Sequence, residues 1–160
     1  MSTQAVTGVI VDSWATQSRV RNAILVMGLT GFTALAAQVS IPLPFTPVPL
    51  TLQTFAVLAG AAALGAERAV IAQVLYITLA VAGAPVLAGG ASGHEVVVGA
   101  TGGYLIGFVL ASYVVGRISS KGASTKSDKT ALAFLAGSVL IYALGAPWLA
   151  FTTGNTITWA

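Results

Sequence analysis

Long runs without a charged residue constrain this chain more than any other feature. Four such runs cover residues 22–66, 69–93, 96–116 and 130–160. Each is longer than the roughly 20 apolar residues that a helix needs to cross a bilayer. Charged residues make up 7% of the chain, whereas a typical soluble domain has about 25%. These values exclude an ordinary soluble fold and intrinsic disorder, and they predict a protein that lies in a lipid bilayer.

The first charge-free run is too long for one crossing, and its prolines divide it. Four prolines lie between residues 42 and 49, and proline cannot continue a helix because it has no backbone N–H donor. The sequence therefore predicts an all-α, multi-pass membrane helix bundle that forms a single transmembrane domain over residues 1–160. Its expected parts are an N-terminal cytoplasmic arm at 1–21 and five spans at about 22–39, 50–65, 69–84, 101–117 and 130–150.

The basic residues all fall on one side of this arrangement of spans. They are Arg19, Arg21, Arg68, Arg117, Lys121, Lys126 and Lys129. Because membrane proteins keep an excess of Lys and Arg in the cytoplasm, we expect a cytoplasmic N-terminus. The segments 40–49 and 85–100 and the C-terminal tail then face outward. The same residues are too few and too scattered for a nucleic-acid face, so no nucleic-acid partner is expected.

The chain lacks the groups that most catalytic, metal and ion-coupling sites need. It has no cysteine and one histidine, so neither a disulfide framework nor an ordinary zinc site is expected. No ionisable residue lies in the middle of a span, which argues against a proton relay, and no phosphate-binding loop for ATP is present. We therefore expect no enzyme, no metal and no cofactor. The alternative is an intramembrane enzyme or assembly factor. A polar cluster within a span would have indicated it, and the sequence has none.

Two outward segments have unusual compositions. Ser40–Gln53 contains the four prolines, and Gly83–Tyr104 contains seven glycines. Irregular backbone at a membrane persists only where protein or a water-filled cavity covers it, and glycines allow a ligand to approach the backbone closely. Both segments can form the wall of a substrate site, but a rigid connector explains the proline-rich segment equally well. We expect His94 and Glu95 to mark a solvated loop tip.

Small residues recur at four-residue spacing in two of the predicted spans. Such a stripe permits close contact between membrane helices. In the fourth span we expect it to pack inside the bundle, whereas the first span is a candidate face for a partner subunit. The oligomeric state stays open, with a homo-oligomer as one alternative. The stripes consist of Gly99, Gly103, Gly107 and Ala111, and of the pairs Thr30/Ala34 and Thr33/Ala37.

Four motifs connect the chain to a known family. They are IPLPFTPVPLTLQTFAVLAGAAALG, APVLAGG, TGGYLIGF and IYALGAPWLAFTTG. Over about residues 22–154 the chain resembles the BioY family, the biotin-binding S components of energy-coupling factor (ECF) vitamin transporters. The resemblance implies a six-helix membrane protein with an outward biotin pocket that the loops after the first and third helices close. It also implies two kinds of partner, a transmembrane coupling protein, which small residues of the first helix would face, and a pair of cytoplasmic ATPases.

The resemblance also implies which residues meet biotin. The expected residues form a lid, a polar group just below it, a close-approach loop and an aromatic flank around the bicyclic ring. Threonine, glutamine, tyrosine and backbone amides suit the ureido group of biotin. In that order the residues are Thr46, Pro47 and Val48, then Gln53, then Gly89 and Gly90, then Tyr104, Tyr142 and Trp148.

The sequence departs from the family pattern at two places. Ala100 stands where the family usually has a proline, and the chain ends at NTITWA where family members continue into a sixth helix that opens with an Asp and a Lys. We therefore expect this 160-residue chain to bind biotin much more weakly than a full family member, or not at all. The alternatives are a truncated membrane fragment without binding and an S component for another vitamin, against which the two loop motifs argue.

Overall fold

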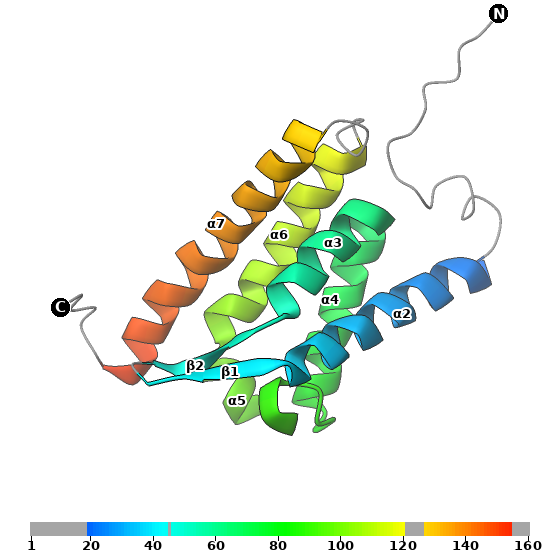
Figure 1. Ribbon diagram of the computed structural model, residues 1–160. Coiled ribbons are helices and arrows are strands. Elements are labelled where there is room, and N and C mark those ends of the chain that lie inside the picture. The colour runs from blue at the N-terminus through cyan, green and yellow to red at the C-terminus, as the bar shows by residue number, and fades with distance from the viewer. Residues whose placement is uncertain (1–18, 45, 121–126, 155–160) are drawn as a thin grey trace, which may run out of the picture.

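Helices that lie side by side form the body of the molecule (Figure 1). The structure is a computed structural model, which describes residues 19–44, 46–120 and 127–154. The long helices of this part are α2 (Arg19–Gln38), α3 (Gln53–Leu64), α4 (Ala66–Val81), α6 (Gly102–Ser120) and α7 (Ser127–Thr153). The strands β1 (Ser40–Leu43) and β2 (Thr46–Thr51), the short helix α5 (His94–Val98) and the 3-10 turn η1 (Ala88–Gly90) lie together at one end of the bundle.

The predicted helical membrane bundle is confirmed. Three helical segments of the described residues are long and apolar enough to cross a membrane: α2, α6 and Lys129–Thr153 of α7. The predicted spans 50–65 and 69–84 correspond to α3 and α4, which are shorter. At 1.5 Å per residue α3 is about 18 Å long, less than the roughly 30 Å of a hydrocarbon core. Five crossings therefore stay a prediction.

The proline-rich segment differs from its prediction, because it pairs with itself instead of forming an unpaired loop. β1 and β2 form an antiparallel hairpin in which Ser40 faces Thr51 and Leu43 faces Thr46. The register shifts between Ile41 and Leu43, around Pro42, which has no N–H to donate to a ladder. Since β2 continues to Thr51, the following helix begins at Gln53, three residues after its predicted start.

Close backbone contacts hold α6 in the centre of the bundle. An added Cβ at Gly107 would lie 2.8 Å from the Ile141 Cα of α7, and one at Gly116 would overlap Ala66 of α4. Ala66 follows Gly65, the one residue between α3 and α4, whose φ of 80° favours glycine. The prediction that the small-residue stripe of the fourth span packs inside the bundle is confirmed.

The small-residue stripes of α2 also face inward, which corrects their assignment as a face for a partner subunit. The Thr30 hydroxyl donates to the Ala72 carbonyl of α4 at 3.0 Å. The Gln73 Nε2 of α4 donates to the Thr33 hydroxyl at 3.3 Å, and Ala37 is fully buried. Threonine hydroxyls that bond across helices belong in a helix interface, so α2 uses this face to pack against α4.

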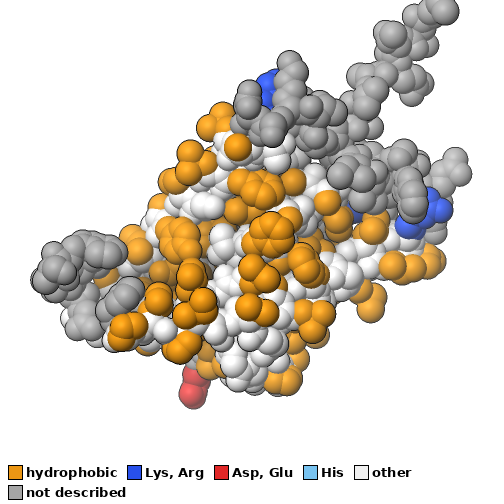
Figure 2. Space-filling view, in the orientation of Figure 1, with side chains coloured by type: hydrophobic (Ala, Val, Ile, Leu, Met, Phe, Trp, Pro, Cys, Tyr) orange, Lys and Arg blue, Asp and Glu red, His pale blue; other side chains and the backbone are white. Residues whose placement is uncertain are grey.

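Apolar side chains cover the face of the helices that Figure 2 shows, with the charged side chains toward its ends, and each long helix has exposed large apolar residues. The described Arg and Lys residues lie at one end, at the starts of α2, α4 and α7 and near the end of α6; they are Arg19, Arg21, Arg68, Arg117 and Lys129. Glu95 lies at the opposite end on α5. An apolar girdle between charged ends is the surface that a bilayer accepts. Lys121 and Lys126 lie outside the described residues.

Two glycine substitutions test the contact between α6 and α7. We expect Gly107→Ala to destabilise the protein by about 1–3 kcal/mol, because the new methyl group meets the α7 backbone. Gly28→Ala is the matched control, since an added Cβ on this exposed part of α2 meets nothing within 4 Å. The measurement is thermal unfolding in detergent. Equal unfolding temperatures for the two variants would argue against the close contact.

A second pair of variants tests the polar contact between α2 and α4. Gln73 is fully buried, and its Oε1 has no hydrogen-bond partner within the described residues. Thr33→Val removes the acceptor for Nε2 as well, and leaving buried polar atoms unpaired costs about 1–3 kcal/mol. Gln73→Met removes the amide altogether, so we expect a change below about 1 kcal/mol. Unfolding temperatures should fall more for Thr33→Val, and the reverse order would refute this assignment.

Candidate binding site between the hairpin and the glycine turn

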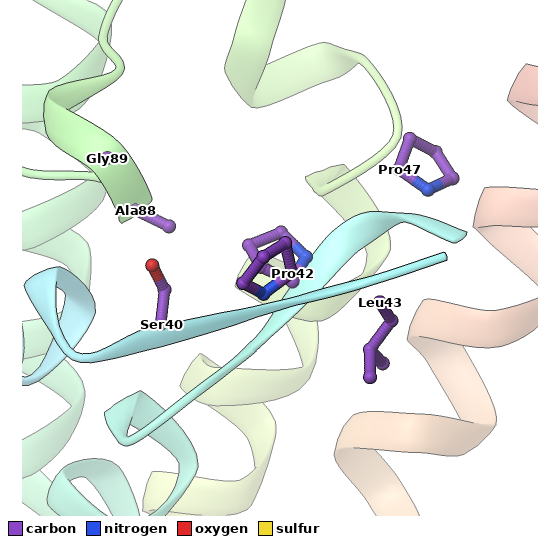
Figure 3. A pocket seen from close by; sticks show the side chains of 7 residues that line it. Ser40, Pro42, Leu43, Pro47, Ala88 and Gly89 are labelled. Atoms are coloured by element: carbon purple, nitrogen blue, oxygen red, sulfur yellow. The ribbon is translucent and has the colours of Figure 1, made fainter. Parts of the chain in front are cut away.

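A cavity opens between the β1–β2 hairpin and η1 (Figure 3). Its volume is about 290 Å³, near the lower end of the roughly 300–1,000 Å³ that small-molecule sites occupy. The lining is mostly proline rings and small side chains, and the Ser40 side chain points from β1 toward the turn that holds Ala88 and Gly89. The lining residues are Ser40, Pro42, Leu43, Pro47, Pro49, Ala88 and Gly89. Such a surface suits a compact apolar ligand with few polar groups.

The hairpin gives one wall of the cavity a fixed shape. Proline rings restrict φ to a narrow range, so the strands lose little conformational freedom when they pair. Next to the strands, the Leu52 N–H donates to the Val39 carbonyl at 3.1 Å. This bond continues the pairing to the last residue of α2 and the first residue of α3. The wall is therefore tied directly to two helices of the bundle.

The opposite wall is a turn that depends on glycine. Gly89 and Gly90 have φ values of 66° and 73°, which L side chains rarely adopt. An added Cβ at either position would meet nothing within 4 Å, so backbone conformation and not crowding requires glycine here. The turn is closed by the Gly90 N–H, which donates to the Leu87 carbonyl at 3.0 Å. Leu87 is 5% exposed and anchors the turn in the apolar core.

A chain of side-chain hydrogen bonds joins the base of the hairpin to the loop before the glycine turn. The Gln53 Nε2 at the start of α3 donates to the Tyr76 hydroxyl of α4 at 2.7 Å. That hydroxyl donates to the Val86 carbonyl at 2.9 Å. The Thr51 hydroxyl donates to the Gln53 Oε1 at 3.1 Å. In this geometry both polar atoms of the Gln53 amide have protein partners.

Residues expected from the lid and the close-approach loop lie at this cavity. Pro47 and Gly89 line it. Val48 and Gly90 belong to the same two elements without being among the lining residues. Thr46 begins β2, and its side chain lies outside what the structure describes. The sequence thus directed attention to both walls, but it did not single out Ser40, Pro42, Leu43, Pro49 or Ala88.

The expected aromatic residues lie where α7 packs against α6 and the residues just before it. The Tyr104 and Tyr142 rings meet edge to face, with centroids 6.1 Å apart. The Trp148 Nε1 donates to the Gly99 carbonyl at 2.8 Å. Glycines make room for these rings, since an added Cβ at Gly145 would overlap the Tyr104 ring. None of the three aromatic residues lines the cavity, so their contact with a ligand stays a prediction.

Tyr76 is the residue that sequence reasoning missed. It lies within α4, where an aromatic residue is as compatible with lipid contact as with burial, and no motif included it. Only the folded structure shows the role of Tyr76, because its hydrogen-bond partners Gln53 and Val86 are 23 and 10 residues away along the chain. Its side chain is fully buried.

Comparisons with known proteins show the family of this chain. The sequence matches the BioY family over residues 5–160. It is 44% identical to the biotin transporter BioY of Thermotoga maritima over 118 residues, which cover 71% of this chain and 67% of that protein. It is 34% identical to the biotin transporter BioY of Rhizobium etli over 132 residues, which cover 78% of this chain and 71% of that protein.

A solved structure shares the fold. The crystal structure of the S-component for biotin from an ECF-type ABC transporter superposes with a TM-score of 0.79 and 25% sequence identity. The match covers 88% of this chain and 77% of that chain. Sequence and fold therefore lead to the same assignment, and this chain belongs to the BioY family.

Proposed function

We propose that this chain is the biotin-binding S component of an ECF-type vitamin transporter, a membrane subunit and not an enzyme. The observation that carries the proposal is the cavity between the hairpin and η1, in a fold that matches a solved S-component for biotin. Both cavity walls come from the segments that sequence composition had indicated as outward loops.

The lining of the cavity fits the chemistry of biotin. The fused ring of biotin is apolar, and proline rings together with Leu43 and Ala88 offer it an apolar surface. The ureido group needs donors and an acceptor, which the Ser40 hydroxyl and the backbone of the glycine turn can supply. The described Arg and Lys residues lie at the other end of the bundle. Among the described residues, backbone N–H groups and the Ser40 hydroxyl are the donors near this cavity that could meet the biotin carboxylate.

The candidate contacts differ in how directly the geometry supports them. Pro47 and Gly89 line the cavity, while Thr46, Val48 and Gly90 belong to the same walls. We retain the aromatic flank of Tyr104, Tyr142 and Trp148 for a ligand that extends from the cavity toward α7. Gln53 is proposed below to act through another residue.

Orientation follows from the placement of charge. The basic end of the bundle faces the cytoplasm under the positive-inside rule, so the cavity opens at the outer face of the cell membrane. The chain captures biotin there and passes it inward with partners. These are a transmembrane coupling protein and a pair of cytoplasmic ATPases, because the sequence has no ATP-binding loop of its own. Self-association remains an alternative that mass measurements in detergent can examine.

Calorimetry tests the proposal directly. The purified protein is titrated with biotin in detergent, with riboflavin and thiamine as controls. We expect saturable binding of one biotin per chain, with the weak affinity that the sequence comparison with full family members predicts, and no heat from the controls. Binding of a different vitamin would favour an S component for that vitamin. The absence of binding to any of them would favour a membrane fragment without transport activity, and both results would overturn the proposal.

A cavity-filling variant locates the biotin site. Ala88 lines the cavity, and we expect Ala88→Trp to raise the biotin Kd about 10- to 100-fold, which corresponds to about 1–3 kcal/mol of overpacking. Val81→Trp is the matched control, because Val81 is exposed at the end of α4 and does not line the cavity. The same calorimetric titration measures both. Equal affinities for the two variants would place the biotin site elsewhere.

A further inference from the structure

We propose that Tyr76 is a positioning residue that couples the two walls of the cavity. The residues Thr51, Gln53 and Tyr76, together with the Val86 carbonyl, are called the hydroxyl bridge below. The effect on biotin rests on the proposed function, whereas the coupling of the walls does not.

The Tyr76 hydroxyl is the central atom of the hydroxyl bridge. It accepts a hydrogen bond from the Gln53 Nε2 at 2.7 Å and donates one to the Val86 carbonyl at 2.9 Å. A phenol has one proton to donate and lone pairs to accept with, so the two bonds use it in opposite directions. One rigid side chain thereby joins the start of α3 to the loop that precedes η1.

Both ends of the hydroxyl bridge lie next to the cavity lining. Thr51, which donates to the Gln53 Oε1 at 3.1 Å, is the strand partner of Ser40, a lining residue. At the other end, Val86 lies two residues before Ala88, which also lines the cavity. We therefore expect a displacement of one wall relative to the other to strain a hydrogen bond of the hydroxyl bridge.

Burial makes these hydrogen bonds hard to replace. Tyr76 is fully buried and Gln53 is 6% exposed, so water has little access to satisfy their polar atoms. Breaking a hydrogen bond in such surroundings leaves unpaired groups in a low dielectric, which costs more than the net value of an exposed hydrogen bond. The two walls are therefore expected to stay in one relative position before a ligand arrives.

A second tie holds the same loop from another helix. The Gln38 Nε2 at the end of α2 donates to the Leu87 carbonyl at 3.1 Å, one residue along from the carbonyl that Tyr76 binds. Gln38 is exposed, so this bond competes with water and adds less than the buried one. The hydroxyl bridge is thus the main polar restraint, and Gln38 assists it.

Gln53 has a structural role in this proposal. The resemblance placed this residue just below the lid as a biotin contact, and that contact stays a prediction. In the structure one N–H of its amide is used by Tyr76 and its amide oxygen accepts from Thr51. Gln53 therefore orients Tyr76 and the base of the hairpin.

The test uses Tyr76→Phe, which removes only the hydroxyl. The chain has no cysteine, so Leu50→Cys and His94→Cys, both at exposed positions, accept one spin label each on the hairpin and beside the turn. Without biotin, the label-to-label distance distribution should be narrow in the labelled parent and broad after Tyr76→Phe. With biotin, we expect Tyr76→Phe to raise the dissociation rate about tenfold. Tyr113→Phe, in an exposed tyrosine of α6, is the control and should change neither quantity.

The outcomes distinguish a failure of the coupling between the walls from a failure of the proposed biotin binding. An unchanged distance distribution after Tyr76→Phe overturns the coupling, even where biotin affinity falls, because Tyr76 would then act by contact or by general stability. If the parent protein binds no biotin, the proposed function fails, while the distance measurement still tests the coupling.

Should Tyr76→Phe fail to fold, Gln53→Met serves instead, since it removes the hydrogen bond between Gln53 and the Tyr76 hydroxyl and keeps an unbranched side chain of similar length. Broadening with Gln53→Met supports the coupling, and a narrow distribution refutes it.

Discussion

Close backbone contact along α6 is the constraint on which the rest of the structure depends. Gly107 lies against the backbone of α7, and Gly116 lies against the Gly65–Ala66 step where α3 turns into α4. In a bilayer the lipid tails are as apolar as the side chains, so helices associate through packing and not through expulsion of water. Small residues on α6 therefore decide how near its neighbours lie. Two hydrogen bonds then fix α2 against α4, one donated by the Thr30 hydroxyl and one accepted by the Thr33 hydroxyl.

A bundle held in this way presents a stable base for irregular structure at one end. The hairpin continues directly from α2 and into α3, and the glycine turn follows α4. Neither wall is a free loop, because buried Leu87 and the hydroxyl bridge attach both to the core. A cavity formed between attached walls is pre-organised, which reduces the ordering that a ligand must impose when it binds.

The parts that sequence predicted are those that local composition decides. The charge-free runs predicted the ends of α2, α6 and α7 to within a few residues. This was possible because the hydropathy of a membrane helix depends only on its own consecutive residues. Strand pairing of the proline-rich segment was missed, since prolines argue against strands and pairing is a non-local property. The inward faces of Thr30 and Thr33 depend on where α4 packs, which no single helix reveals. Tyr104, Tyr142 and Trp148 were expected around a ligand by resemblance. The structure shows their protein contacts, between the two tyrosine rings and from Trp148 to the Gly99 carbonyl, and their contact with a ligand stays a prediction.

Hydrogen–deuterium exchange with and without biotin tests the central claim, that the hairpin and the glycine turn are the two walls of one biotin site. The account predicts slower amide exchange in both residues 40–52 and residues 84–93 when biotin is present, with no change around the Gly65 turn at the far end of the bundle. Protection of only one wall, or protection spread equally over both ends of the bundle, would contradict it.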